Sequence, residues 1–207
     1  MKRVGWLARV GLSLVLAGSL SGASCTSALI SHEQGVVLTE QVKKMPYLAM
    51  IEGLQPASGY RMKELGEQIA GSSGVSACAT SGNCLEHMKF IRQASSNNQQ
   101  VYIAGFSMGE NEARTLAEQC NREKIGVERL FLIDGPNTGK IPENVRKAVD
   151  IVGTEPYVFR RGKRYGENNL ENPRTEIKHY EVSAGHLDVP AASRSIIESE
   201  ISSSRGR

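Results

Sequence analysis

From residue 47 onward, short apolar runs alternate with segments whose apolar residues recur at helical spacing. The short runs, typical of buried strands, cover residues 47–51, 75–79, 101–104, 129–133, 148–152 and 177–182. The helical spacing is seen at Met62, Leu65 and Ile69, at Leu85, Met88 and Ile91, at Ala113, Leu116, Ala117 and Cys120, and at Ile196, Ile197 and Ile201. This alternation predicts an α/β fold, with a mostly parallel sheet covered by helices on both faces. Functional residues of such sheets collect at the carboxyl ends of the strands.

The N-terminal stretch has a different pattern. Three cations, Lys2, Arg3 and Arg9, precede an apolar run at 10–17 and mostly small residues at 18–24. This order is typical of an export signal, and the apolar run is shorter than the roughly 20 residues that a membrane span needs. We therefore expect a signal peptide at 1–24, an N-terminal tether or irregular segment at 25–45, and one α/β domain at 46–207.

Cys25 follows Gly22-Ala23-Ser24, where a bacterial lipoprotein signal places its lipidated cysteine. Gly22 departs from the aliphatic residue that is usual three positions before that cysteine. Lipidation of Cys25 and ordinary cleavage after Ala23 or Ser24 are both left open. Either way, we expect an exported protein of the bacterial periplasm or cell envelope, attached to the membrane if Cys25 is lipidated.

Charge and composition narrow the classes of partner. With 40% hydrophobic and 23% charged residues, the chain is typical of a soluble globular domain. Removing residues 1–24 removes three cations and no anions, which lowers the formal charge from +3 to 0. The basic character therefore belongs to the signal, and no nucleic-acid partner is predicted. The basic cluster at 160–164 is interpreted as a solvated loop.

The spacing of the cysteines does not predict a metal site. Cys78 and Cys84 flank a turn-rich stretch, and a disulfide between them is left open, since exported chains meet oxidising conditions. Cys120, in a helical pattern, is interpreted as a small core residue. There is no CxxC pair and no closely spaced pair of histidines, so zinc is not expected.

The motif with the clearest chemistry is Gly105-Phe106-Ser107-Met108-Gly109. It follows a strand pattern and opens a helical one, which is the context of a G-x-S-x-G nucleophile elbow. A sharp strand-to-helix turn would expose Ser107, and its small neighbours would allow the close approach of other chain segments. We predict Ser107 as a nucleophile.

A serine hydroxyl needs a base, and His186 has the right position. It lies just after the last strand and before a helix, in a loop at a strand's carboxyl end. His32 is in the polar N-terminal segment and His87 in a helix before the elbow. His179 lies inside a strand, where we expect a half-buried structural residue.

Two carboxylates could complete a triad. Asp134 ends the strand after the nucleophile helix, and Glu155 follows the next strand. Either gives the chain order Ser, acid, His. Because the acid must be ionised and fixed to orient the imidazole, Asp134 is favoured: an apolar strand and Gly135-Pro136 bracket it. Glu155 stays the alternative. For the oxyanion hole we predict the N–H groups of Met108 and Leu54, the latter in the loop after the first strand.

At these residues the chain resembles the α/β-hydrolase superfamily over most of 46–201, and in particular small bacterial lipase- and thioesterase-like serine hydrolases. The matching features, in order, are Gly53 with Ser58-Gly59, Gly105–Gly109, Asp134 with Pro136, Asn144-Val145, and His186 with Pro190. The resemblance implies the triad Ser107, Asp134 and His186. It departs at Phe106, where family elbows often carry His or Tyr.

The predicted function follows from these residues. About 183 residues remain after the signal, which leaves little room for a lid, so a minimal, cutinase-like hydrolase is expected. We expect hydrolysis of a carboxylic ester or lipid through an acyl-enzyme, with no cofactor. Thioester or peptide hydrolysis is the alternative among enzymes. A catalytically silent, hydrolase-shaped envelope binding protein is the alternative outside them.

Overall fold

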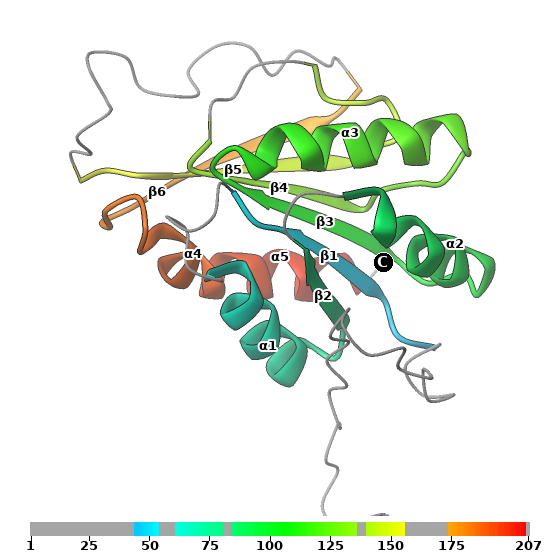
Figure 1. Ribbon diagram of the computed structural model, residues 1–207, viewed down its shortest axis with the longest axis horizontal. Helices are drawn as coiled ribbons and strands as arrows, with labels where there is room; N and C mark the ends of the chain where they lie inside the picture. Colours follow the sequence, from blue (N-terminus) through cyan, green and yellow to red (C-terminus); the bar gives the residue numbers. More distant parts are fainter. Residues whose placement is uncertain (1–43, 54–60, 81–83, 136–139, 156–173, 206–207) are drawn as a thin grey trace, which may run out of the picture.

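The computed structural model describes residues 44–53, 61–80, 84–135, 140–155 and 174–205. Six parallel strands form one sheet in the order β2-β1-β3-β4-β5-β6 (Figure 1). They are β1 (Tyr47–Ile51), β2 (Ser76–Thr80), β3 (Val101–Phe106), β4 (Arg129–Ile133), β5 (Lys147–Gly153) and β6 (Glu176–Val182). The predicted strands are confirmed, with ends displaced by at most two residues.

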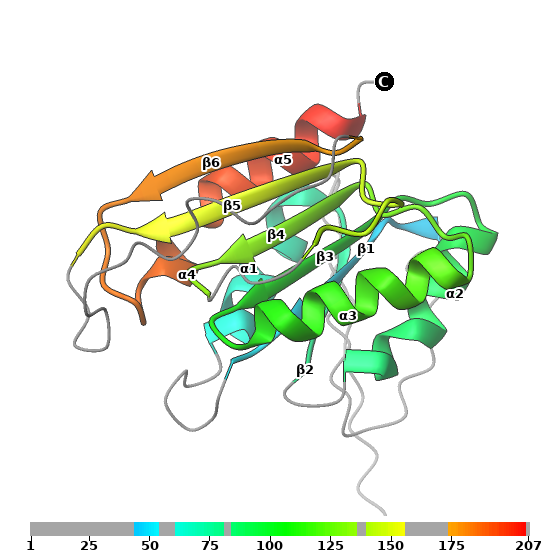
Figure 2. The same ribbon diagram turned by 90° about the horizontal axis from the view of Figure 1, so that it is seen from above.

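Helices cover both faces of this sheet (Figures 1 and 2). One face carries α1 (Arg61–Ser73), α4 (Val189–Ala192) and α5 (Arg194–Arg205); the other carries the 3-10 helix η2 (Cys84–His87), α2 (Met88–Ser96) and α3 (Gly109–Arg122). The predicted α/β class is therefore confirmed, and the architecture is consistent with the α/β-hydrolase fold. The expectation of little or no lid concerns segments outside the described residues, among them 54–60 and 156–173.

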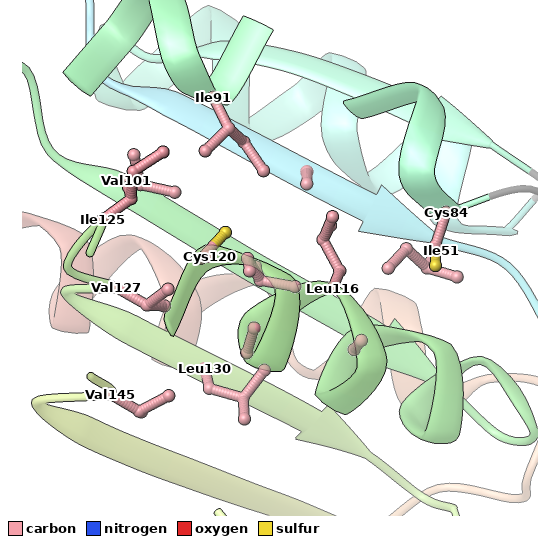
Figure 3. Packing of buried hydrophobic residues seen from close by; sticks show 14 of the residues in the cluster. Ile51, Cys84, Ile91, Val101, Leu116, Cys120, Ile125, Val127, Leu130 and Val145 are labelled. Atoms are coloured by element: carbon pink, nitrogen blue, oxygen red, sulfur yellow. The ribbon is translucent and has the colours of Figure 1, made fainter. Parts of the chain in front are cut away.

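Strand residues alternate between two apolar cores, as the period of a strand requires. In β1, for example, Tyr47, Ala49 and Ile51 pack toward α2 and α3, whereas Leu48 and Met50 pack toward α1. Figure 3 shows the first of these cores. Because both faces are covered, β1 is buried along its whole length, which explains its continuous apolar sequence.

The strand order changes direction at β1. The chain passes from β1 to β2 on one side, and then returns to place β3 on the other side of β1. In open parallel sheets, ligands bind beyond the carboxyl ends of the strands at such a switch point. Gly53 follows β1 and Ser107 follows β3, so both lie at this place.

The C-terminal segment differs from its prediction. The sequence pattern ends the last helix near Ile201 and starts a polar tail at Ser202, but α5 continues to Arg205. Ser204 is buried, and its hydroxyl lies 2.7 Å from the Tyr102 hydroxyl on β3. A hydrogen-bonded serine can thus occupy the inner face of a helix, and this extends α5 over the sheet.

All three described cysteines are buried free thiols. The disulfide between Cys78 and Cys84 that the sequence left open is not formed. Burial raises the pKa of Cys78 to about 11 and those of Cys84 and Cys120 to about 12, which keeps them protonated. Cys120 is the core residue that the helical pattern predicts (Figure 3).

The predictions for 1–43 lie outside the described residues, including the signal peptide, Cys25 and His32. Leu54, Pro136 and the basic cluster at 160–164 also lie outside the described residues. In the part of the chain that the structure describes, no helix is long and apolar enough to span a membrane.

Candidate active site

Ser107 occupies the sharp turn between β3 and α3. Its backbone has φ +55°, a left-handed conformation that non-glycine residues rarely adopt. Two hydrogen bonds fix the turn: the Ser107 N–H donates to the Ile133 carbonyl at 2.8 Å, and the Ser107 carbonyl accepts from the Glu110 N–H at 3.1 Å. The elbow geometry that the motif predicts is therefore present.

The two glycines of the motif are needed for close packing. A Cβ on Gly109 would lie 2.6 Å from the Ile51 carbonyl oxygen, and a Cβ on Gly105 would lie 2.8 Å from the Ala113 Cβ. Either contact is closer than real Cβ atoms approach other atoms. The glycines thus let the start of α3 sit directly against the ends of β1 and β3.

Asp134 lies in a second turn of the same kind, directly after β4. Its backbone has φ +48°, and its N–H donates to the Ile151 carbonyl at 2.8 Å. The carboxylate is buried, with Oδ1 accepting from the Gly153 N–H at 3.1 Å. Its other oxygen, Oδ2, lies 2.6 Å from Nδ1 of His186. The carboxylate is therefore held from two sides.

His186 lies between Asp134 and Ser107. Its Nε2 is 3.1 Å from Ser107 Oγ, while its Nδ1 contacts Asp134. The imidazole is mostly covered, with 14% of the side chain exposed, and it packs against the buried ring of Phe106. After His186 the chain turns sharply, since the Gly185 carbonyl accepts from the Asp188 and Val189 N–H groups.

These contacts favour one tautomer of a neutral His186 imidazole. An ionised carboxylate can only accept hydrogen bonds, so the Nδ1–H of a neutral His186 donates to Asp134. The other nitrogen, Nε2, is then an acceptor facing the Ser107 hydroxyl. That is the tautomer a general base needs in order to remove the serine proton.

Backbone strain singles out the same residues. Four non-glycine residues in the described ranges have positive φ: Asn98, Ser107, Lys124 and Asp134. Asn98 and Lys124 follow the ends of α2 and α3, where left-handed residues are common. Ser107 and Asp134 instead end strands. Such conformations cost about 1–3 kcal/mol each and cluster at functional sites.

Glu155, the alternative acid, lies beside Gly185, the residue before His186. It is exposed, and its Oε2 lies beside Gly185, 3.6 Å from where a Cβ on that glycine would be. Because Asp134 Oδ2 already contacts Nδ1 of His186, the geometry favours the first of the two predicted acids.

The other described histidines have partners elsewhere. His87 is fully buried between the Tyr47 hydroxyl, 2.7 Å from Nδ1, and the Thr80 hydroxyl, 2.9 Å from Nε2. His179 was expected to be half-buried, and this is wrong: 57% of its side chain is exposed, since β6 is an edge strand. Its Nδ1 lies 2.8 Å from the buried Asp150 carboxylate.

One predicted oxyanion donor is described. The Met108 N–H belongs to the N-terminal end of α3, where the first N–H groups have no acceptor within the helix. A Cβ on Gly53 would lie 3.0 Å from the Ser107 Cβ and 3.5 Å from the Met108 nitrogen. The end of β1 is thus next to Ser107, whereas Leu54 lies outside the described residues.

Two exposed apolar residues are sequence neighbours of the site residues. The large hydrophobic residues exposed in the described chain are Leu85, Met108 and Leu187. Two of them directly follow Ser107 and His186 in sequence.

Two residues at the site were not assigned a role from the sequence. Phe106 contacts His186, and Glu110 contacts the turn that carries Asp134. A signal for Glu110 exists: it lies on the inner stripe of α3 with Ala113, Ala117 and Cys120. A carboxylate on an apolar helix face needs a buried partner.

This chain is similar to known proteins in structure, at low sequence identity. No protein-family model and no curated protein matches the chain. A solved structure of human thioesterase 2 matches with a TM-score of 0.49 and 12% identity, covering 77% of this chain and 97% of that one. Est1E from Butyrivibrio proteoclasticus matches with a TM-score of 0.43 and 14% identity, covering 77% of this chain and 90% of that one.

Proposed function

We propose that this chain is a serine hydrolase that cleaves a carboxylic ester or lipid ester, with Ser107 as nucleophile, His186 as base and Asp134 as the acid of the triad. The observation that carries the proposal is the unbroken chain of contacts from Asp134 Oδ2 to His186 Nδ1, and from His186 Nε2 to Ser107 Oγ. These residues lie on three different strand ends, 27 and 52 positions apart. A shared chemical role explains why these three side chains lie together better than packing of the core does.

The reaction follows from the geometry. His186 Nε2 takes the hydroxyl proton as Ser107 Oγ attacks the ester carbonyl, and Asp134 stabilises the imidazolium that forms. The negative charge on the carbonyl oxygen develops next to the Met108 N–H, at the N-terminus of α3. Collapse of the tetrahedral intermediate expels the alcohol, which takes the proton from His186. Water then attacks the acyl-enzyme while His186 takes a proton from it. The second tetrahedral intermediate collapses, Ser107 regains its proton from His186, and the carboxylic acid is released.

An apolar acyl or alcohol group is proposed for the substrate. Met108 and Leu187 are 47% and 37% exposed and follow the nucleophile and the base in sequence. Exposed apolar side chains next to reacting groups gain free energy when a hydrophobic group covers them. We further propose export to the bacterial periplasm or cell envelope, for which the support is the basic and then apolar order of residues 1–24.

A panel of p-nitrophenyl esters from acetate to palmitate, with matched thioesters and a peptide anilide, tests this proposal. We expect ester turnover that rises with chain length over the shorter acyl groups and is lost in Ser107→Ala. Faster turnover of the thioesters or the anilide would change the substrate class and keep the nucleophile. Absence of turnover with every substrate would favour a silent binding protein.

A further inference from the structure

Glu110 is a fully buried carboxylate three residues after the nucleophile. Its Oε1 accepts a hydrogen bond of 2.7 Å from the N–H of Gly135, the residue that follows Asp134. A buried carboxylate is costly unless hydrogen bonds or charges compensate it, so this contact stabilises one particular backbone position. That position belongs to the turn carrying the triad acid.

The fit between the two turns is tight. A Cβ on Gly135 would overlap the Glu110 side chain and lie 2.5 Å from the Ser107 carbonyl oxygen. Glycine therefore lets the acid turn rest directly on the nucleophile turn. Two hydrogen bonds join these turns: Ser107 N–H to the Ile133 carbonyl, and Gly135 N–H to Glu110. They lie on either side of Asp134 in the sequence.

The strain of Asp134 explains why such a contact is needed. An aspartate at φ +48° returns to an ordinary conformation unless its surroundings hold it. The Asp134 N–H bond to Ile151 holds the residue on one side, and the Gly135 N–H bond to Glu110 holds it on the other.

The charge of Glu110 is balanced within the same helix. Its Oε2 lies 3.7 Å from Nη1 of Arg114, whose side chain is only 8% exposed and also donates to Asn111. Burial lowers the pKa of the Arg114 guanidinium, but arginine stays protonated. This ion pair offsets part of the cost of burying the Glu110 carboxylate.

We propose that Glu110 is a positioning residue that holds the Asp134 turn in register with the nucleophile elbow, an inference that rests on the proposed function. It acts through Asp134 and does not touch the substrate. Glu110→Ala leaves the Gly135 N–H without its acceptor and frees the turn. A misplacement of the acid of about 1 Å costs roughly 100-fold in rate.

Measurements of kcat distinguish a positioning role of Glu110 from a role in stabilising the helix. We expect Glu110→Ala to lower kcat by about 10- to 100-fold with KM changed less than about three-fold, because the substrate contacts are intact. Glu110→Gln keeps an oxygen that can accept from Gly135, so its kcat should stay within about three-fold of wild type. Equal losses in the Ala and Gln variants would overturn the proposal.

Two matched controls lie on the same helix. Glu112→Ala removes the other carboxylate of the first turn of α3, and Arg114→Met removes the ion pair of Glu110 without removing the Gly135 acceptor. Both should lower the melting temperature and leave kcat within about two-fold. If either control loses as much kcat as Glu110→Ala, the carboxylate acts through the helix and the proposal fails.

A double-mutant cycle tests the route through Asp134. In an Asp134→Asn background, Glu110→Ala should lower kcat by less than about two-fold, since there is no triad acid left to position. A full additional loss of 10- to 100-fold would contradict the proposal.

A measurement that does not depend on turnover tests the role of Glu110 separately from the proposed function. The ring proton between His186 Nδ1 and Asp134 gives a far-downfield proton NMR signal that reports their hydrogen bond. Glu110→Ala should shift or broaden this signal, and Arg114→Met should leave it in place. If Ser107→Ala shows that the hydrolase proposal is wrong, this signal decides the positioning role alone: an unchanged signal in Glu110→Ala overturns it.

Discussion

The rings of Phe106 and His186 lie 4.9 Å apart between centroids, with their planes inclined at 31°. Phe106 is the residue before the nucleophile, and it is fully buried. One side of the imidazole is thus in contact with an apolar ring, while Asp134 and Ser107 contact its two nitrogens. A base held in this way has little freedom to rotate away from the serine.

Shortening Phe106 should therefore affect catalysis as well as stability. We expect Phe106→Leu to lower kcat by about 10-fold, because the imidazole gains room to move. The loss of ring volume should cost on the order of 1–2 kcal/mol of unfolding free energy. Phe131→Leu is the matched control, since Phe131 is equally buried in the same core on the neighbouring strand. It should lose similar stability at unchanged kcat, and equal kcat losses in both variants would contradict the account.

The choice between the two acids has a direct kinetic test. Asp134→Asn leaves the imidazole without its orienting carboxylate, which in serine proteases costs about 10⁴-fold in turnover. Glu155→Gln changes an exposed carboxylate and should stay within a few-fold of wild type. Both substitutions nearly conserve volume, and thermal melts check the fold. A crippled Glu155→Gln beside an active Asp134→Asn would assign the acid to the next strand.

The sequence predicted most of this fold because the parallel sheet is covered on both faces. The inner strands β1 and β4 are mostly apolar runs, and such runs are visible without the structure. The sharp turn at Ser107 was also predictable, since Gly105 and Gly109 mark the close approach of α3 to the strands.

Side-chain partners were harder to predict. Asp134 and Glu155 both follow strands, and only the left-handed turn at Asp134 directs one of them at His186. The inner stripe of α3 marks Glu110 as buried, but its partner was missed because a backbone N–H has no sequence signature. The exposure of His179 depends on β6 being an edge strand, and strand order is not written in local patterns.

Stability at low pH should depend on Glu200 of α5. Burial alone raises the pKa of this carboxyl, but hydrogen bonds from Lys147, Tyr180 and Lys178 outweigh it and lower the pKa to about 2. A depressed folded-state pKa stabilises the fold above the unfolded value of about 4.5, and the stabilisation is lost as pH falls from there toward 2. The difference in urea midpoint between wild type and Glu200→Gln should therefore be largest near neutral pH. It should shrink below about pH 4.5, and a difference that grows on acidification would contradict this.

Export makes a prediction about the mature protein. Expressed in a bacterium from the full sequence, the chain should lose its first two dozen residues. Intact-mass measurement of the envelope fraction then separates the two open forms: a diacylglycerol adduct on Cys25, or an unmodified N-terminus at Ser24 or Cys25. An intact Met1 in that fraction would contradict the export signal.

The central claim is that Ser107 is an activated nucleophile, and labelling by a fluorophosphonate tests it most directly. The account predicts one equivalent of label on the peptide that contains Ser107, with labelling and ester turnover both lost in Ser107→Ala at an unchanged melting temperature. His186→Ala should slow the labelling strongly, because Oγ then has no base. Wild-type turnover by Ser107→Ala, or label on a different residue, would contradict the account.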